Sequence, residues 1–297
     1  MLNSIADILK EAQTLKTKTL VIAKANDEHV LKAIKAASDE DIVNAVLIDD
    51  KKALLKTMQS LNMNESDYEI VDIEDKVKAS EEAVKRVSKS KDAILMKGLV
   101  DTSIILRAAL SKDFGLRSKN RLSHVSVIEN PHYHKLITMS DGAMNIAPDV
   151  SIKKEIIENA VEVTKALGID NANVAVLAAV EKVNDKMQAT LDAETLKKES
   201  FDFATVDGPF ALDNAIDKEA AKHKGITSPM AGNADILLMP MIEAGNIFYK
   251  SMMFLSEAKS ASVIMGATHP IVLTSRADSF ETKFHSIALA ALIAAIK

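Results

Sequence analysis

Short runs of β-branched and aliphatic residues alternate with longer segments of helical periodicity along the whole chain. In the first half the apolar runs are Thr19–Ala23, Val43–Ile48, Tyr68–Ile73, Ala93–Gly98 and His124–Glu129. In the second half they are residues 173–180, 203–208, 235–240, 260–266 and 271–275. Strands without a polar side are typical of a parallel sheet that helices cover on both faces. The alternation therefore predicts an α/β fold with α/β/α layers.

The length of the chain, 297 residues, is enough for about two domains. The least regular part is residues 129–150, which hold two of the six prolines between two regular α/β blocks. We place the passage from a first lobe to a second lobe in this stretch.

The composition excludes several classes of protein. The net charge of −5 argues against general nucleic-acid binding, which needs a basic face. The absence of cysteine excludes disulfides, thiolate nucleophiles and cysteine-ligated metals. The N-terminal MLNSIADILKEAQTLK has acidic residues and no long apolar run, so we expect no signal peptide. The apolar stretch Ile287–Ile296 is too short to cross a bilayer, and is expected to be a buried helix or a subunit contact. We expect a cytoplasmic protein that binds neither membrane nor nucleic acid and forms a homo-oligomer.

The glycines exclude further chemistry. None of the nine belongs to a G-x-G sequence, so the chain has neither a dinucleotide fingerprint nor a P-loop. A G-x-S-x-G nucleophile elbow is also absent from the sequence. We expect no metal site and no permanently bound cofactor.

Residues that directly follow apolar runs are the candidates for function, because ligands of parallel α/β sheets bind at the carboxyl ends of strands. Five such places carry polar residues or glycine: Lys97-Gly98, Asp141-Gly142, Glu181-Lys182-Val183-Asn184, Asp207-Gly208-Pro209 and Ser275-Arg276.

Arg276 is the sharpest of these candidates. Only five of the 37 basic residues are arginines, so each arginine suggests a place where lysine would not serve. Arginine offers a planar fork of donors that matches phosphate or carboxylate. Arg276 lies between an apolar run and the helical segment SFETKFHSIALAALIAAI, whose free N–H groups would point to the same space. The alternative is that Asp278 caps this helix, with Glu281 at its third position, and that Arg276 pairs with either carboxylate.

Several segments resemble the phosphate acyltransferases. SPMAGNADILLMPMIEAGNIFYK, from Ser228 to Lys250, is similar to the family signature, and TSRADS stands where the family has its Ser-Arg pair. DGAMN (residues 141–145) and LRAAL (residues 106–110) match more loosely. AAVEKVNDKM, VDGPFALDNA and SRADS resemble the phosphate butyryltransferase branch more than the phosphate acetyltransferase branch.

The resemblance implies a fold like that of isocitrate and isopropylmalate dehydrogenases, with two α/β/α lobes, mostly parallel sheets and an active cleft between the lobes. In that fold the last helix returns to the first lobe. We therefore predict a discontinuous first domain of residues 1–130 plus 276–297, and a second domain of residues 131–275.

The implied reaction is reversible transfer of a short acyl group between coenzyme A and inorganic phosphate, in which butanoyl-CoA and phosphate give butanoyl phosphate and CoA. The implied partners are therefore CoA or acyl-CoA as substrate, phosphate and acyl phosphate. A direct ternary-complex mechanism needs no enzyme nucleophile, which agrees with the lack of cysteine.

By resemblance, Arg276 would bind the phosphoryl group, Ser275 would hydrogen-bond the reacting centre and Arg107 would share the phosphate charge. The acetyl branch has an aspartate base seven residues after the serine, but this chain has Thr282 there, which cannot accept a proton. The alternatives for the base are the nearest carboxylates, Asp278 and Glu281, and a carboxylate of the other lobe, with Asp278 preferred.

Six further residues are candidates for substrate binding, and each also has a structural interpretation. Gly245 and Asn246 open a helix onto the ligand or only cap it. Lys182, Asn184 and Asp207 face the cleft or belong to strand-end turns. Lys97 contacts an anion or lies on the surface.

Three other functions stay open. They are a phosphate acetyltransferase with a two-carbon preference, a non-catalytic module that binds acyl phosphate or CoA, and a metal- and NAD-dependent decarboxylating dehydrogenase on the same fold. The last would need a cluster of aspartates around a divalent metal, which the sequence does not suggest.

Overall fold

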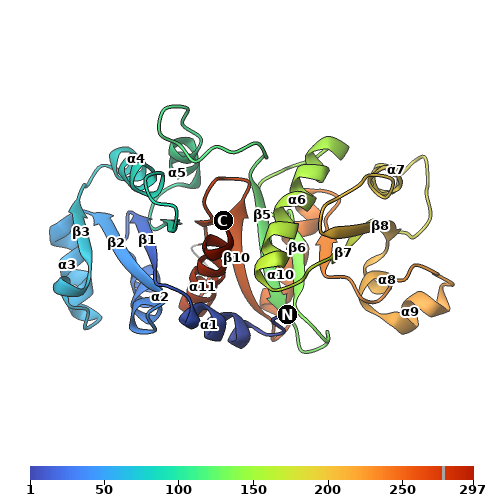
Figure 1. Cartoon of the computed structure of the whole chain (residues 1–297), viewed down its shortest axis with the longest axis horizontal. Coiled ribbons are helices and arrows are strands. Elements are labelled where there is room, and N and C mark those ends of the chain that lie inside the picture. Colours follow the sequence, from blue (N-terminus) through green and yellow to red (C-terminus); the bar gives the residue numbers. More distant parts are fainter. Residues whose placement is uncertain (276–277) are drawn as a thin grey trace. The chain divides into compact units, whose positions relative to one another are not determined.

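The computed structural model describes residues 1–275 and 278–297. Its contacts divide the chain into two compact units (Figure 1). Unit 1 comprises Met1–Ser4 and Asn120–Ser260, and unit 2 comprises Ile5–Lys119 and Ala261–Lys297. In both units parallel strand pairs prevail and helices connect the strands, which confirms the predicted α/β class.

The strands of unit 2 lie in the order β3-β2-β1-β4-β11-β10. Neighbours are parallel except for β10, which runs antiparallel to β11. Their bounds are β1 Lys18–Ala23, β2 Val43–Asp49, β3 Glu69–Asp72, β4 Ala93–Lys97, β10 Lys259–Met265 and β11 Ile271–Val272. β10 begins with the last two residues of unit 1 and continues in unit 2. The central strands β1 and β4 are almost entirely buried, as their continuous apolar runs predict.

Most helices of unit 2 lie between consecutive strands along the chain. They are α1 Ile5–Thr14, α2 Glu28–Asp39, α3 Lys51–Ser60, α4 Lys76–Val87, α5 Thr102–Ala109 and α11 Phe280–Ile296, with a short 3-10 helix at Glu65–Asp67. Three of these helices begin at an aspartate whose carboxylate accepts the N–H three residues later: Asp27, Asp50 and Asp75. These caps satisfy donors that the first helical turn leaves free.

The strands of unit 1 lie in the order β5-β6-β9-β7-β8, and only the β5–β6 pair is antiparallel. Their bounds are β5 Ser123–Glu129, β6 Ile137–Ser140, β7 Ala172–Leu177, β8 Ala204–Phe210 and β9 Ile236–Leu238. The strand β6 was missed, because it is a four-residue run inside the stretch that we predicted to be irregular. All four of its residues are buried.

The helices of unit 1 are α6 Val150–Ala166, α7 Gln188–Leu196, α8 Leu212–Ile216, α9 Lys218–His223 and α10 Ile242–Leu255. One core cluster joins β5, β6, β7, β8 and β9 through residues such as Ile128, Met139 and Leu237. The inner side of α10 packs against this cluster through Phe248, Tyr249 and Met252.

The C-terminal helix α11 is buried within unit 2. It packs against α1 and α2, and the three helices lie side by side in Figure 1. Ile287, Leu289 and Ile293 are fully buried. The apolar side chains of this helix therefore form part of the core of unit 2. Of the two interpretations of the stretch Ile287–Ile296, the buried helix is confirmed. The stretch no longer supports a subunit contact.

The observed units divide the chain at other residues than the predicted domains, residues 1–130 plus 276–297 and residues 131–275. β5 belongs to unit 1, where the buried Ser123 accepts a hydrogen bond from Asn159 of α6. β11 belongs to unit 2, where it pairs with β4. A contact with α6 places β5, and pairing with a strand far away in the sequence places β11.

Within the described residues, no helix is both long enough and apolar enough to span a membrane.

Candidate active site

Several strand ends of unit 2 meet at one edge of its sheet. In the pairing of β1 with β4, Ala23 lies opposite Lys97. In the pairing of β4 with β11, Met96 lies opposite Val272. Parallel neighbours lie about 5 Å apart, so the residues after these strands emerge side by side. The backbone N–H groups of Gly98 and Leu99 donate to Ala23 and Lys24 at 2.9 and 2.6 Å. The register therefore brings Lys97 and Ser275 to the same edge.

Ser275 and Asp278 close a tight turn after β11. The N–H of Ser275 donates to Oδ2 of Asp278 at 2.7 Å, and the N–H of Asp278 donates back to the Ser275 carbonyl at 3.2 Å. Ser275 is exposed and Asp278 is half-buried. Arg276, the predicted phosphate ligand, lies outside the described residues.

Lys283 of α11 holds both ends of this turn. Its Nζ donates to the carbonyl oxygens of Ser275 and Asp278 at 3.0 and 2.7 Å. The side chain is buried, and burial lowers the pKa of Lys283 although Asp278 and Asp27 act in the opposite direction. Sequence reasoning missed this residue, and the available signal was a lysine in an otherwise apolar helix.

The helix α11 begins one residue later than the capping alternative required. Its N-cap is Ser279, whose hydroxyl accepts the N–H of Thr282 at 3.2 Å, and Glu281 is the second helical residue. The carboxylate of Asp278 is bound to Ser275 instead, so the interpretation of Asp278 as the N-cap is wrong. A hydrogen bond from Ser279 lowers the pKa of the exposed Glu281. A lowered pKa makes Glu281 a weaker base than an ordinary glutamate.

Lys97 is buried at the end of β4. Its Nζ lies 3.2 and 3.3 Å from the carbonyl oxygens of Gly98 and Val100. Lys24, which follows β1, is also buried, and its ammonium pairs with Asp49 and donates to the Glu74 carbonyl at 3.0 Å. Lys24 was missed although it follows an apolar run as Lys97 does. Its ion pair gives it a structural role.

Arg107 lies in the last turn of α5 and is exposed. It lines a cavity of about 360 Å³ together with Val77, Glu81, Ile104 and Phe114. It lies five positions after the first residue of the helix, which is roughly 8 Å along the axis. Its side chain therefore belongs to the groove between α4 and α5.

Asp207 joins two signature segments of unit 1. Its carboxylate accepts hydrogen bonds from Ser228 at 2.5 Å and from the Gly208 N–H at 2.8 Å, and it pairs with Lys197 at 2.6 Å. Burial works against its charge, but the hydrogen bonds from Lys197, Ser228 and Gly208 lower the pKa of Asp207 overall. The serine that opens the SPMAG segment is thus anchored to the strand that carries VDGPF.

A second contact joins the DGAMN segment to α10. The amide of Asn246 donates to the Gly142 carbonyl at 3.1 Å. A Cβ added to Gly245 would lie 2.3 Å from the Asp141 carbonyl oxygen, so only glycine allows this approach. The helix begins at Ile242, and both residues therefore lie inside it rather than at its start. Gly245 and Asn246 bind the neighbouring loop in this structure.

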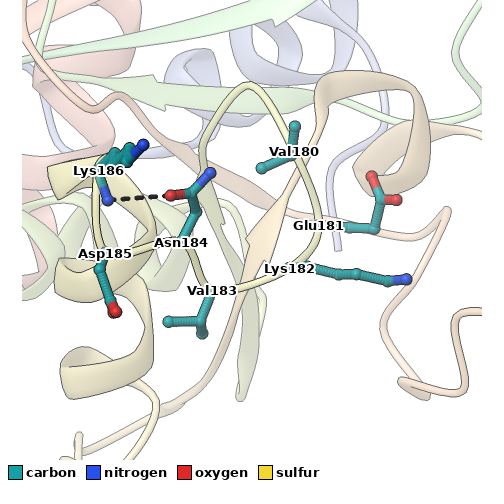
Figure 2. A pocket seen from close by; sticks show the side chains of 7 residues that line it. All are labelled: Val180, Glu181, Lys182, Val183, Asn184, Asp185 and Lys186. Carbon is teal, nitrogen blue, oxygen red and sulfur yellow. Dashed lines mark hydrogen bonds between the residues drawn. The ribbon is translucent and has the colours of Figure 1, made fainter.

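Lys182 and Asn184 line an open cavity of about 570 Å³ that the loop from Val180 to Lys186 forms (Figure 2). Both residues are exposed. The side-chain oxygen of Asn184 accepts the Lys186 N–H at 2.9 Å, and its backbone is bound to the buried Thr190. Figure 2 shows Lys182 on the other side of the loop, with its side chain extended away from Asn184.

The structure thus gathers the predicted residues into separate groups. In unit 2, Ser275, Asp278 and Glu281 lie around the start of α11, with Lys97 at the same sheet edge. In unit 1, Gly245 and Asn246 contact the loop after β6, and Asp207 contacts Ser228. The part of the chain that the structure describes contains no group of three or more histidine, aspartate or glutamate side chains that could hold a metal ion.

Comparison with known proteins gives full-length matches. Residues 4–94 and 77–291 match the family described as phosphate acetyl/butaryl transferase. The chain is 46% identical over 299 residues to the phosphate butyryltransferase of Clostridium beijerinckii, and the alignment covers 99% of each protein.

Solved structures agree. A branched-chain phosphotransacylase from Enterococcus faecalis is similar with a TM-score of 0.85 and 35% identity, over 94% of this chain and 99% of that one. A Salmonella typhimurium protein described as a 4-hydroxythreonine-4-phosphate dehydrogenase has a TM-score of 0.57 at 11% identity, over 94% and 100% of the two chains. This second likeness concerns the fold alone, and it confirms the dehydrogenase-like architecture predicted from the sequence.

Proposed function

Since the chain belongs to the phosphate acetyl/butaryl transferase family, it is an acyltransferase, and we propose that it prefers butanoyl among the acyl groups that it moves between coenzyme A and phosphate. The preference rests on the 46% identity to a phosphate butyryltransferase over 99% of both proteins. The segments AAVEKVNDKM, VDGPFALDNA and SRADS, which resemble the butyryltransferase branch, support the same preference.

We propose that the turn from Ser275 to Asp278 binds the phosphoryl group. Arg276 would supply a two-pronged donor for a tetrahedral oxyanion, and Ser275 would donate its exposed hydroxyl to the reacting centre. Fixed donors directed at developing negative charge supply much of the rate in acyl transfer, on the order of 3 kcal/mol each. Lys283 would keep this turn in place through its two carbonyl contacts.

We propose Asp278 as the base that takes the proton of the CoA thiol. A free thiol has a pKa of about 8.5, so it is mostly protonated at neutral pH and gains from a base. The carboxylate of Asp278 lies in the turn itself, next to Ser275. Glu281 is the alternative, and the hydrogen bond from Ser279 that lowers its pKa already engages its carboxylate. Acyl transfer would be direct, within a ternary complex of enzyme, CoA substrate and phosphate, with no other cofactor.

We propose that the protein is a homo-oligomer that associates through α10 rather than α11. Ile247, Phe254 and Leu255 are 65%, 72% and 85% exposed. They recur after seven and eight residues and therefore lie on one side of the helix. A second copy offers the same apolar strip, as a two-fold symmetric interface requires.

The test is phosphate-dependent release of CoA from butanoyl-CoA, followed with a thiol reagent. The wild-type protein should release CoA only when phosphate is present, and faster from butanoyl-CoA than from acetyl-CoA. Arg276→Ala should lower kcat/KM for phosphate by at least about 100-fold, because phosphate loses its two-pronged partner.

Arg86→Ala is the matched control. Arg86 pairs with Glu69 and Glu82 on the surface, and its loss should leave turnover unchanged. Near-normal turnover of Arg276→Ala would contradict the site assignment. A different outcome would indicate a non-catalytic binding module. The protein would then bind butanoyl-CoA, but phosphate would cause no release of CoA from any short acyl-CoA.

A further inference from the structure

A cavity of about 510 Å³ lies in unit 1 where three helices begin. Its walls come from the loop before α6 and the first turn of α6, from the first residues of α7, and from the residues just before α10. β9 ends at Leu238, shortly before this wall, and the loop before α6 starts where β6 ends at Ser140. The cavity therefore lies at the carboxyl edge of this group of strands, where α/β folds bind ligands.

The polar groups in the wall already have partners. Lys153 and Asp192 are 3% and 5% exposed and form an ion pair at 2.5 Å. The second oxygen of Asp192 accepts the Gln188 amide at 2.8 Å. The carboxylate of Asp149 is bound to the Ser151 hydroxyl and the Ile152 N–H at 2.7 and 2.9 Å. A ligand would find few free charges in this wall.

The remainder of the wall is apolar. It consists of Ala147, Pro148, Val150, Ala189, Pro240 and Met241. Met241 is 47% exposed, and the adjacent Ile146 is 69% exposed, its carbonyl bound to the N–H of Ile242. Large apolar side chains beside an apolar cavity are typical of a site for an apolar ligand.

The size suits an acyl chain. An apolar cavity of about 150 Å³ holds a benzene molecule, so 510 Å³ is ample for a chain of four carbon atoms or a branched chain. The similar proteins carry different acyl groups in their names, butyryl in one case and branched-chain in another. Residues that decide the size of the acyl group must therefore exist within this fold.

We propose that this cavity holds the acyl chain of the acyl-CoA substrate, and that Ala189 and Met241 limit the length of chain that fits. The inference rests on the proposed acyltransferase function and adds the residues that select among substrates. Ala189 is a small residue in the first turn of α7, and Met241 is a flexible residue at the N-cap of α10.

The test is kcat/KM for acetyl-, butanoyl- and hexanoyl-CoA in wild type and variants. Ala189→Leu places three more carbon atoms in the cavity, and leucine is a good helix former. It should lower kcat/KM for butanoyl-CoA by at least about 10-fold relative to acetyl-CoA, since one methylene in a hydrophobic pocket is worth roughly 10–200-fold. Met241→Ala should raise kcat/KM for hexanoyl-CoA by about 5-fold or more relative to kcat/KM for butanoyl-CoA.

Thr195→Leu is the control. It adds an apolar side chain at an exposed position of the same helix, outside the cavity wall, and should leave all three ratios unchanged. The inference would be overturned if Ala189→Leu lowered kcat/KM equally for all three acyl-CoAs. It would also be overturned if the ratios of kcat/KM between acyl-CoAs stayed unchanged in both cavity variants.

If wild type releases no CoA from any acyl-CoA, the proposed function fails, and calorimetric binding then tests the cavity separately. Wild type should bind butanoyl-CoA more tightly than acetyl-CoA, and Ala189→Leu should remove that difference. Equal affinity of wild type for both thioesters would overturn the inference.

Discussion

A single carboxylate, that of Asp207, shows how a residue can tie distant parts of a motif together. Its partners come from α7's end, from its own strand and from a loop 21 positions further along the chain. Burial alone would favour the neutral acid, but three donors favour the charged form. The charge of Asp207 therefore stabilises the contact between β8 and the SPMAG segment.

We expect this contribution to depend on pH. The pKa of Asp207 in the folded protein lies below its ordinary value of 3.8. The stabilisation is thus complete above the unfolded pKa and is lost as the pH falls through the folded pKa. Asp207→Asn should destabilise the protein at pH 7 by on the order of 1–2 kcal/mol. Thermal unfolding from pH 7 to 3 should show the difference from wild type shrinking as the pH falls.

Asp213→Asn is a suitable control for that experiment. Asp213 also pairs with a lysine, Lys224, at 2.9 Å, but its side chain is 49% exposed. Exposed pairs contribute little, so this variant should stay close to wild type at every pH. A difference for Asp207→Asn that stayed constant between pH 7 and 3 would contradict the assigned role of its charge.

At the scale of elements, α11 has two tasks. Its apolar side chains fill the core of unit 2 against α1 and α2. Its first turn also places the ammonium of Lys283 under the turn from Ser275 to Asp278. The core contacts fix the helix and therefore the position from which the Lys283 side chain reaches the two carbonyl groups.

Lys283→Met should separate these two tasks. Methionine has a similar length and suits a buried site, so the thermal midpoint should change by only a few degrees. The two carbonyl groups lose their donor, and the turn loses its position. We expect KM for phosphate to rise by about 10-fold or more, with KM for acyl-CoA nearly unchanged, in steady-state kinetics with each substrate varied.

Lys18→Met provides the comparison. Lys18 is also a buried lysine of unit 2, but it lies at the start of β1, away from the carboxyl ends of the strands. Its replacement should affect stability without changing KM for phosphate. A rise of both Michaelis constants by the same factor in Lys283→Met would indicate general damage rather than loss of position in the turn.

At the scale of the whole molecule, the question is which apolar surface remains after the chain has folded. α11 is buried, whereas α10 exposes Ile247, Phe254 and Leu255. Exposed apolar strips of this kind are typical of protein interfaces. Burying the strip against a second copy would remove this apolar surface from water in both copies at once.

If α10 mediates the proposed association, Phe254→Glu combined with Leu255→Glu should give a monomer. Two carboxylates in the centre of an apolar interface would be desolvated without partners. Sedimentation velocity gives the mass of both proteins. Val77→Glu, at an exposed valine of α4, should keep the wild-type mass. A monomeric wild type would contradict the proposed association.

Much of the architecture could be predicted from the sequence, because strand and helix patterns are local. Continuous apolar runs such as Ala93–Gly98 became buried strands. β6 escaped prediction because four residues inside a stretch rich in turn-forming residues carry little pattern. One of the alternatives left open by the sequence placed the cap of α11 at Asp278, because aspartate and serine are both good N-caps. The hydrogen bond from Ser275 occupies the Asp278 carboxylate and leaves Ser279 as the cap.

By itself, the sequence determined the α/β class, the family and the residues worth testing, since these depend on local periodicity and on motifs that are contiguous in the chain. Only the tertiary structure decided which of those residues meet. Three contacts join segments that are far apart in the chain. Val272 pairs in register with Met96, Ser228 donates a hydrogen bond to Asp207, and Gly245 packs closely against Asp141. Such contacts follow from strand register and close packing, which no local pattern contains.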